Sequence, residues 1–346
     1  MTLVQEPRAK GDTQAVSDDP ALSVVVPCFN EEENLKALLD RTRAAAEASF
    51  GEDYEIVLVD DGSNDRTWPM IEEAAEASAQ IIAIKLSRNH GHQIALTSGL
   101  ALARGEVILV IDADLQDPPE LLADMLATMR AEGADVVYGK RKTRKGETWF
   151  KKASASLFYR LLARNAEIQL PLDAGDFRLM TRRVAQALVA MPEGDRFVRG
   201  MVSWIGLKQV AFEYTRDERH AGETKYPLRK MLRLAAHAFM GFSMLPLRFA
   251  ARFAAIMFFF MIAFMIYALA SWLLFETVSG WTSLMIMFAF SSAMQFLVLS
   301  VLGEYVGRTY LASKGRPLFI VDQVAGAPLA RVDEARQSAR NPGVWL

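Results

Sequence analysis

The stretch "VILVIDADLQDPPE", residues 107–120, decides the fold and locates the chemistry. An apolar run typical of a buried strand ends in Asp112, Asp114 and Asp117, and two prolines then mark the first turn of a helix. Three carboxylates this close together indicate that the strand ends at a functional edge of its sheet, where the negative charge can bind a ligand.

Four more runs of β-branched residues resemble this strand, and helical segments separate them. Strands are expected over residues 22–26, 54–59, 81–86, 106–111 and 134–139. Helices are expected from Asn30, with Glu33 completing a capping box, and over residues 66–79, 92–103 and 118–132. This alternation predicts an α/β domain with a doubly wound, Rossmann-like, mainly parallel sheet. Ligands of such sheets bind beyond the carboxyl ends of the strands, so the segments that follow the strands should share one edge.

The composition and the loops exclude some classes of function. The 346 residues carry 39 basic and 41 acidic side chains, and a net charge of −2 gives no global field for gripping nucleic acid. The single cysteine, Cys28, can form neither an internal disulfide nor a thiolate metal cluster, which is compatible with a reducing compartment. Neither G-x-G-x-x-G nor G-x-x-x-x-G-K-S/T follows the first strand, so dinucleotide binding and ATP hydrolysis are not expected.

Two long apolar runs predict transmembrane helices. Residues 253–275 and 277–303 contain no charged side chain, and each run exceeds the ~20 residues that cross a bilayer core. Basic residues flank the pair on both sides and are absent from the link around Glu276, so the α/β domain and both termini should face the cytosol. Two helices buried in a soluble core are the competing interpretation, which such long uninterrupted runs disfavour.

These features divide the chain into five parts. They are a flexible N-terminal tail (1–20), the α/β domain (21–226), an amphipathic juxtamembrane helix (227–248), two transmembrane helices (249–304) and a cytosolic C-terminal segment (305–346). The tail has no apolar run resembling a signal peptide, and residues 324–346 are expected to be loosely ordered.

Asp112 and Asp114 are the candidate metal ligands. A turn at the strand end can bring both carboxylates to one ion, and their oxygens suit Mg²⁺ or Mn²⁺. The competing interpretation is that D-x-D only caps the helix that begins near Pro118. The same predicted edge carries Asp60 and Asp61, and this neighbourhood favours a metal site.

Asp60 and Asp61 follow the second strand in the segment DDGSND. One of them is expected to stabilise the turn or cap the next helix, and the other to bind a nucleobase or ribose. His90 and His92 follow the third strand without a carboxylate or cysteine partner nearby in the sequence, so zinc binding is not expected.

The segment LDAGDFRLM, residues 172–180, holds a further charged cluster. Either Asp176 or Asp173 can orient an acceptor group or take its proton, and Arg178 can stabilise charge that develops on a diphosphate. A buried structural ion pair is the competing interpretation. Lys225, in a glycine-containing loop ahead of the membrane helices, suits an anionic lipid head group but can equally be a solvated charge.

Five motifs together resemble those of the glycosyltransferase family 2 enzymes of the polyprenyl-phosphate branch. They occur in the family's order across residues 22–310: VVVPCFNEEENL, EIVLVDDGSNDRTW, VIDADLQDPPE, LDAGDFRLM and RHAGETKYP. The resemblance implies a GT-A fold that binds a nucleotide sugar and a divalent metal, Mg²⁺ or Mn²⁺, in a multi-pass protein of the inner (cytoplasmic) membrane. It also implies inverting transfer of the sugar to a polyprenyl phosphate such as undecaprenyl phosphate. A homo-oligomer is expected by analogy with relatives that form tetramers.

The same resemblance implies roles for individual residues. Those expected to line the nucleotide sugar are Pro27, Phe29, Glu31, Val59, Asp61, Asp112, Gln116 and Arg141. Asp112 and Asp114 match the metal ligands, and Asp176, Arg178 and Asp114 match the catalytic positions. Arg178 and Lys225 match residues that bind the lipid phosphate.

UDP-glucose is the expected donor, because RHAGETKYPLRKM and RFVRGMVSWIG are closer to bacterial glucosyl-type members than to mannose synthases. Phe29 replaces the more usual tyrosine, so a phenolic contact to the nucleotide is lost. The alternatives are a mannosyltransferase that uses GDP-mannose and a non-catalytic, membrane-anchored protein that binds nucleotide sugars or carries lipid. A processive polysaccharide synthase is not expected, since the sequence lacks Q-x-x-R-W and further membrane helices.

Overall fold

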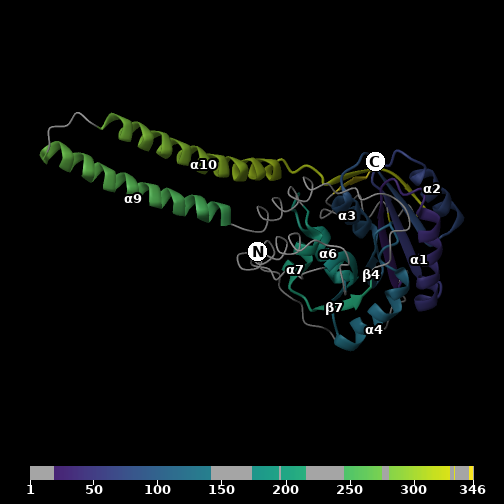
Figure 1. Cartoon of the computed structure of the whole chain (residues 1–346). Helices are drawn as coiled ribbons and strands as arrows, with labels where there is room; N and C mark the ends of the chain where they lie inside the picture. Colours follow the sequence, from purple (N-terminus) through teal and green to yellow (C-terminus); the bar gives the residue numbers. More distant parts are fainter. Residues whose placement is uncertain are drawn as a thin grey trace.

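Figure 1 shows the computed structural model of this protein, an α/β domain from which two long helices extend. The structure describes residues 19–141, 174–194, 196–215, 245–274, 280–327, 331 and 343–345. Most of the N-terminal tail, residues 227–244 of the predicted juxtamembrane helix, Asp173 and Lys225 lie outside these ranges.

Within the described residues, the domain is built on one mixed sheet of nine strands in the order β7-β5-β6-β4-β1-β2-β3-β8-β9. Its strands are β1 (Leu22–Cys28), β2 (Tyr54–Asp60), β3 (Ile81–Leu86), β4 (Val107–Val110), β5 (Val136–Arg141), β6 (Ala174–Thr181), β7 (Gln209–Tyr214), β8 (Phe319–Ala325) and β9 (Gly343–Trp345). Strands β4, β1, β2 and β3 are parallel neighbours. All seven residues of β1 and of β2 are buried, as expected for parallel strands covered on both faces.

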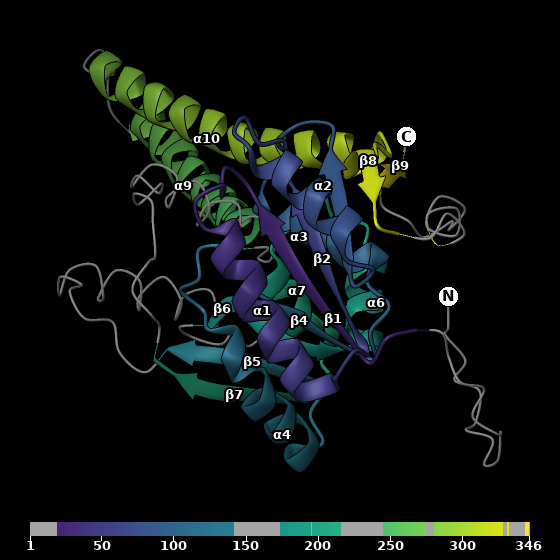
Figure 2. The same ribbon diagram turned by 90° about the vertical axis from the view of Figure 1, so that its right-hand side faces the viewer.

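Helices cover both faces of the sheet (Figure 2). Helices α1 (Leu35–Phe50), α2 (Thr67–Ala77) and α4 (Leu122–Glu132) pack on one face, and α3 (His92–Leu102), α6 (Arg182–Ala190) and α7 (Val198–Ile205) on the other. Successive residues of β1 serve opposite cores, because Val24 packs in the first core and Val25 in the second. Helix α3 lies close to β1 because residue 99 is glycine: a Cβ there would be 2.5 Å from Cγ1 of Val25.

The sheet is less parallel than the sequence predicts. Strand β6 is inserted between β4 and β5 and runs antiparallel to both, and β8 is antiparallel to β3. Strand β6 was not predicted, because the charged residues Asp176 and Arg178 interrupt its apolar run. A buried strand is predicted from a continuous apolar run. The fold is therefore an α/β fold with a mixed sheet, which is compatible with the GT-A fold that the resemblance implies.

The first helix begins later than predicted. Helix α1 starts at Leu35, and its N-cap residue Asn34 makes no side-chain capping bond. Asn30 adopts a left-handed φ of 54°, and its Oδ1 accepts a hydrogen bond from the backbone N–H of Asn64 at 2.9 Å. The capping box predicted for Asn30 and Glu33 is therefore wrong, because Asn30 joins the loop after β1 to the loop after β2.

The C-terminal segment contributes to the domain. Strand β8 extends the sheet beyond β3, and β9 pairs with β8 in turn. Arg331 forms a buried ion pair with Glu55 of β2. The expectation of loose order for residues 324–346 is therefore wrong for the described residues among them, which cover an otherwise open edge of the sheet.

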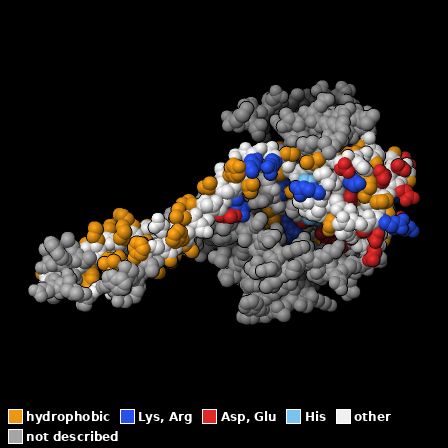
Figure 3. Space-filling view, turned by 90° about the horizontal axis from the view of Figure 1, so that it is seen from above, with side chains coloured by type: hydrophobic (Ala, Val, Ile, Leu, Met, Phe, Trp, Pro, Cys, Tyr) orange, Lys and Arg blue, Asp and Glu red, His pale blue; other side chains and the backbone are white. Residues whose placement is uncertain are grey.

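Helices α9 (Leu245–Leu274) and α10 (Trp281–Ser313) run side by side away from the domain in both views (Figures 1 and 2). Hydrophobic side chains gather along them (Figure 3). Phe259 and Phe296 are 69% and 71% exposed. Within the described residues, one segment, Phe290–Ser313, is long and apolar enough to cross a membrane, and Arg252–Tyr267 is a shorter apolar stretch. The sequence predicts two spans: Phe290–Ser313 overlaps the one predicted at residues 277–303, and the one predicted at residues 253–275 stays a prediction.

Candidate active site

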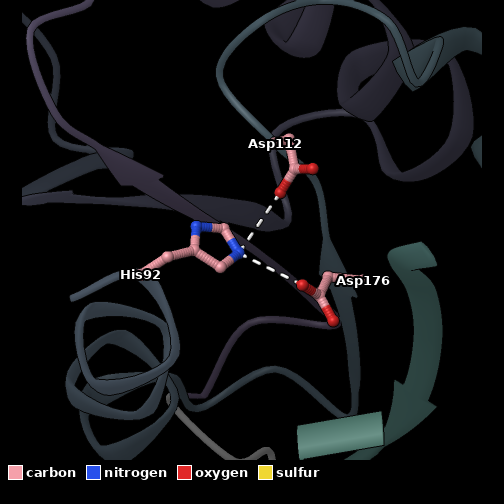
Figure 4. A group of neighbouring side chains, drawn as sticks. All are labelled: His92, Asp112 and Asp176. Atoms are coloured by element: carbon pink, nitrogen blue, oxygen red, sulfur yellow. Dashed lines mark ion pairs between the residues drawn. The ribbon is translucent and has the colours of Figure 1, made fainter. Parts of the chain in front are cut away.

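Three side chains from different elements meet at the carboxyl edge of the parallel strands (Figure 4). His92 is the first residue of α3, Asp112 follows β4, and Asp176 lies on β6. Nε2 of His92 lies 3.5 Å from Oδ1 of Asp112 and 3.3 Å from Oδ2 of Asp176. His92 has no carboxylate partner nearby in the sequence, and its two partners in the structure come from strands that lie further along the chain.

The register of β4 and β6 explains why the two carboxylates are neighbours. Val110, the last residue of β4, lies opposite Arg178 in the antiparallel pair. Each step forward on one strand is a step back on the other, so continuing this register by two residues places Asp112 opposite Asp176. Two carboxylates packed this closely need a positive partner, and His92 is placed between them.

Asp176 is 4% exposed and is held by side chains from both neighbouring helices. Nε2 of Gln93 donates to its Oδ2 at 3.0 Å, and Nε of Arg199 donates to its Oδ1 at 3.0 Å. Nη2 of Arg178 lies 3.6 Å from Oδ1 and also donates to the carbonyl of Gly175 at 3.1 Å. One carboxylate thus faces two guanidinium groups, so the β6–α7 side of the site carries excess positive charge.

The pKa values of the three central groups follow from this arrangement. Burial lowers the pKa of His92, but the hydrogen bond and the charge from Asp176, together with the charge of Asp112, outweigh it and raise that pKa to about 9. Burial, reinforced by neighbouring carboxylates, raises the pKa of Asp112 to about 6 although His92 opposes it. Burial also acts to raise the pKa of Asp176, yet Arg199, His92 and Arg178 hold it well below its usual range. These shifts keep Asp176 ionised and favour the protonated form of His92 at neutral pH, and a cation bound to Nε2 of His92 would displace that proton.

In the loop after β4, side chains alternate between the site and the core. Asp112, Asp114 and Gln116 are half-buried, whereas Leu115 and Asp117 are buried. Oδ1 of Asp114 accepts the backbone N–H of Gln116 at 3.2 Å, which shapes the turn. Asp117 accepts a hydrogen bond from the hydroxyl of Tyr214 at the end of β7. Asp117 thereby anchors the loop in the core and leaves the other two acids at the edge.

The residues around Asp112 fit a hard divalent cation. One ligand atom each from His92, Asp112 and Asp176 lies within 4.8 Å of the others, and Oδ1 of Asp112 is buried with no hydrogen-bond partner in the part of the chain described. Carboxylate oxygens are the ligands that Mg²⁺ and Mn²⁺ prefer. Asp114, the second ligand expected from the sequence, follows in the same loop but is not part of this close group.

Asp60 and Asp61 accept hydrogen bonds from different loops. Both carboxylate oxygens of Asp60 lie 3.3 Å from the backbone N of Ser63, which fits the turn role expected for one of the pair. The carboxylate of Asp61 accepts the backbone N–H groups of His90 at 2.7 Å and Gly91 at 2.9 Å. Burial raises the pKa of both carboxyl groups above the usual value. Asp61 thus shapes the loop after β3, and its contact with a nucleotide stays a prediction.

The other residues expected to line the nucleotide lie along the same edge. Pro27 and Val59 are opposite each other on β1 and β2 and are buried, whereas Phe29 and Glu31 are half-buried in the following loop. Arg141 ends β5, but its side chain lies outside the described part of the structure.

Besides His92, two residues at the site were not predicted from the sequence. Gln93 follows His92 in the segment after β3. Because ligands bind beyond the carboxyl ends of the strands, this segment was expected at the site, but nothing in the sequence singled out Gln93 from its neighbours. Arg199 lies in the first turn of α7, and no local pattern relates that turn to Asp176. Its place in the site depends on how α7 packs against the sheet.

Comparison with known proteins identifies related chains. Residues 23–189 match the family described as Glycosyl transferase family 2. An uncharacterized glycosyltransferase of Bacillus subtilis (strain 168), YkcC, is 45% identical over 88% of this chain and 94% of its own length. A prophage bactoprenol glucosyl transferase homolog of Escherichia coli (strain K12) is 36% identical over 88% of this chain and 99% of its own.

Solved structures that resemble part of this chain were also found. One is glucosyl-3-phosphoglycerate synthase from Mycobacterium tuberculosis in complex with Mn²⁺, UDP and glucosyl-3-phosphoglycerate. It is 21% identical, covers 64% of this chain and 78% of its own, and superposes with a TM-score of 0.43.

Proposed function

This chain belongs to glycosyltransferase family 2, and we propose that it transfers a hexose from a nucleotide sugar to a polyprenyl phosphate. The proposed donor is UDP-glucose and the proposed acceptor is undecaprenyl phosphate, at the cytosolic face of the inner membrane. A relative described as a bactoprenol glucosyl transferase homolog aligns with 88% of this chain, which supports both glucose and a lipid acceptor.

One structural observation carries the proposal: opposite charges are divided between neighbouring strands at a single edge. The loop after β4 presents Asp112 and Asp114, which suit a cation, whereas β6 and α7 present Arg178 and Arg199, which suit an anion. The donor needs the cation environment, because a metal ion binds its diphosphate, and the acceptor needs the anion environment for its phosphate. The reaction requires the two environments side by side. A protein that only binds nucleotide sugars needs no second, anion-binding environment.

The reaction we propose is a single displacement with inversion. The phosphate of the acceptor attacks the anomeric carbon from the face opposite the departing nucleotide diphosphate. Because this phosphate is already an anion at neutral pH, positioning and charge neutralisation lower the barrier more than proton removal does. A divalent cation, Mg²⁺ or Mn²⁺, at Asp112 and Asp114 would stabilise the negative charge of the leaving group.

Asp176 serves this reaction by holding positive groups in place. Both of its oxygens accept hydrogen bonds from Gln93 or Arg199, and its pKa lies well below the usual range, so it is a poor proton acceptor. Arg178, which is buried, would act on the lipid phosphate through its charge and not by contact, and Lys225 would supply further positive charge. The residues proposed to bind the nucleotide sugar are Pro27, Phe29, Glu31, Val59, Asp61, Asp112, Gln116 and Arg141.

The membrane arrangement follows the sequence prediction. We propose that α9 and α10 both cross the bilayer, with the domain and both termini in the cytosol, because basic residues flank the helix pair. This places the acceptor phosphate at the bilayer surface, within reach of the domain. A homo-oligomer remains a prediction, which sizing of the protein in nanodiscs checks.

The test incubates the full chain in nanodiscs with Mn²⁺, undecaprenyl phosphate and either UDP-glucose or GDP-mannose. Release of UDP together with a glucosylated lipid is expected only when the lipid phosphate is present. Undecaprenol, which lacks the phosphate, is the matched control and should give no product. A mannosylated lipid from GDP-mannose would replace the donor assignment, and binding of a nucleotide sugar without turnover would favour a non-catalytic binding protein.

A further inference from the structure

The two guanidinium groups beside Asp176 differ in accessibility. The Arg178 side chain is 3% exposed, and its Nε and Nη2 donate to the backbone carbonyls of Asp176 and Gly175. The Arg199 side chain is 36% exposed while its Nε and Nη2 hold the carboxylate of Asp176. Arg199 is therefore the one of the two that a substrate can reach.

Gln93 ties Arg199 to the site. Its Oε1 accepts the backbone N–H of Val198 at 2.9 Å, and its Nε2 donates to Oδ2 of Asp176 at 3.0 Å. One amide group thus joins the first turn of α3, strand β6 and the first turn of α7. Because Val198 directly precedes Arg199, this bond sets the position from which the guanidinium reaches Asp176.

The order of the strands places Arg199 away from most of the residues proposed to bind the nucleotide. Most of the residues proposed to bind the nucleotide follow β1, β2 and β4, whereas Asp176, which holds Arg199, lies on β6, on the other side of β4 from β1 and β2. Arg141, at the end of β5, is the exception. Helix α7 packs in the core formed on the α3 and α6 face, at the end of the domain from which α9 and α10 extend (Figure 1).

We propose that Arg199 binds the phosphate of the lipid acceptor and that Gln93 is the positioning residue that holds it there. The inference rests on the proposed function and names the acceptor subsite of the same site. The ligand is a phosphate monoester, and the donor diphosphate is the other phosphate that a guanidinium at this edge can meet. The binding of the acceptor and the binding of the donor must therefore be measured separately.

The kinetic test compares the wild type with Arg199→Gln, Arg199→Lys and Gln93→Leu, each as the full chain in nanodiscs. The KM for undecaprenyl phosphate is measured at saturating UDP-glucose and Mn²⁺, and the Kd of UDP with Mn²⁺ is measured by calorimetry. For Arg199→Gln we expect the lipid KM to rise about 10- to 100-fold, the effect of losing a charge-assisted hydrogen bond, with an unchanged Kd for UDP. Arg199→Lys should raise the lipid KM less than Arg199→Gln does, because lysine keeps the positive charge but lacks the planar guanidinium that can donate two hydrogen bonds to one phosphate.

Arg41→Gln is the matched control. Arg41 is 34% exposed and pairs with Glu120 at 2.7 Å, so it resembles Arg199 in exposure and pairing but lies outside the site. Its kinetics should equal those of the wild type. An unchanged lipid KM in Arg199→Gln, or an equal loss of UDP affinity, would overturn the assignment of Arg199. For Gln93→Leu, a raised lipid KM with an unchanged Kd for UDP supports the positioning role, and losses shared equally by both ligands contradict it.

A binding measurement without turnover keeps this inference separate from the proposed reaction. Farnesyl phosphate and farnesol differ only in the phosphate, and the wild type should prefer farnesyl phosphate. Loss of that preference in Arg199→Gln supports the subsite even if the wild type makes no glycosylated lipid, a result that would refute the reaction alone. A preference that survives in Arg199→Gln, or that is missing in the wild type, overturns the role of Arg199.

Discussion

Arg331 forms a buried ion pair with Glu55, which lies 276 residues earlier in the chain. Its Nη1 is 2.6 Å from Oε2 of Glu55 and its Nη2 is 2.9 Å from Oε1, with side chains 8% and 6% exposed. Glu55 also accepts hydrogen bonds from the Ser23 hydroxyl and from the backbone N–H of Arg104. The pair lies at the amino end of β2, opposite the candidate active site, and fastens the C-terminal segment to the sheet.

Arg331→Leu should destabilise the domain strongly, because it leaves a carboxylate buried without its cation. The expected loss is about 3–5 kcal/mol in the free energy of unfolding. Thermal unfolding of the full chain checks it, and Arg331→Leu combined with Glu55→Gln should recover part of the loss. Arg41→Gln breaks an exposed pair, for which about 1 kcal/mol or less is expected. Equal effects of Arg331→Leu and Arg41→Gln would contradict a stabilising role for the buried pair.

Asp114→Asn should sharply weaken Mn²⁺ binding and reduce turnover by about 100-fold or more, because a metal ligand that stabilises the leaving group is lost. Titration of Mn²⁺ followed by electron paramagnetic resonance measures the binding without turnover. Asp124→Asn, an exposed carboxylate in the first turn of α4, is the control and should bind Mn²⁺ as the wild type does. Wild-type Mn²⁺ affinity in Asp114→Asn would remove Asp114 from the ligand set.

Tyr214→Phe should both destabilise the domain and weaken Mn²⁺ binding. The Tyr214 hydroxyl donates to Asp117, and both residues are buried, so its removal should cost about 1–3 kcal/mol. The loop that carries Asp112 and Asp114 then loses an anchor, and a several-fold weaker Mn²⁺ affinity is expected. Tyr54→Phe removes a comparable hydroxyl bond to Glu47, of 3.1 Å, away from the site and should leave Mn²⁺ affinity unchanged. Equal Mn²⁺ affinities in the two variants would refute the anchoring role of Asp117.

Asp65→Ala should destabilise the domain in a pH-dependent way. Oδ1 of Asp65 accepts the backbone N–H of Thr67 at 3.0 Å, and Oδ2 accepts that of Glu32 at 3.3 Å. Burial acts to raise the pKa of Asp65, but the hydrogen bonds from Thr67 and Glu32 lower it below the usual value. Its contribution is therefore fully present above the pKa of the unfolded chain, about 3.9, and is lost as the pH falls through the lower folded pKa.

At neutral pH, Asp65→Ala should cost about 0.5–2 kcal/mol, as for the loss of a helix cap. Urea denaturation at several pH values checks both the size and the trend. The difference from the wild type should narrow as the pH falls below about 4. A difference that stays constant down to the lowest pH would show that packing, and not the ionised carboxylate, stabilises this loop.

Local pattern predicted most of the parallel core. The runs at residues 22–26, 54–59 and 81–86 became β1, β2 and β3, because alternation and flanking turn residues act within a few positions. Strand β8 was missed, since its sequence FIVDQVA follows a long apolar helix and pairs with β3 more than two hundred residues away. The capping box at Asn30 was wrong for the same reason, because Asn30 bonds to Asn64 of another loop.

The sequence by itself determined which side chains follow each strand, and hence that Asp61, His92 and Asp112 share one edge of the sheet. Only the tertiary structure decided which of them touch. The antiparallel insertion of β6 places Asp176 opposite Asp112, and the packing of α7 places Arg199 on Asp176. Register between distant strands depends on which faces are buried together, and no local period in the sequence records it.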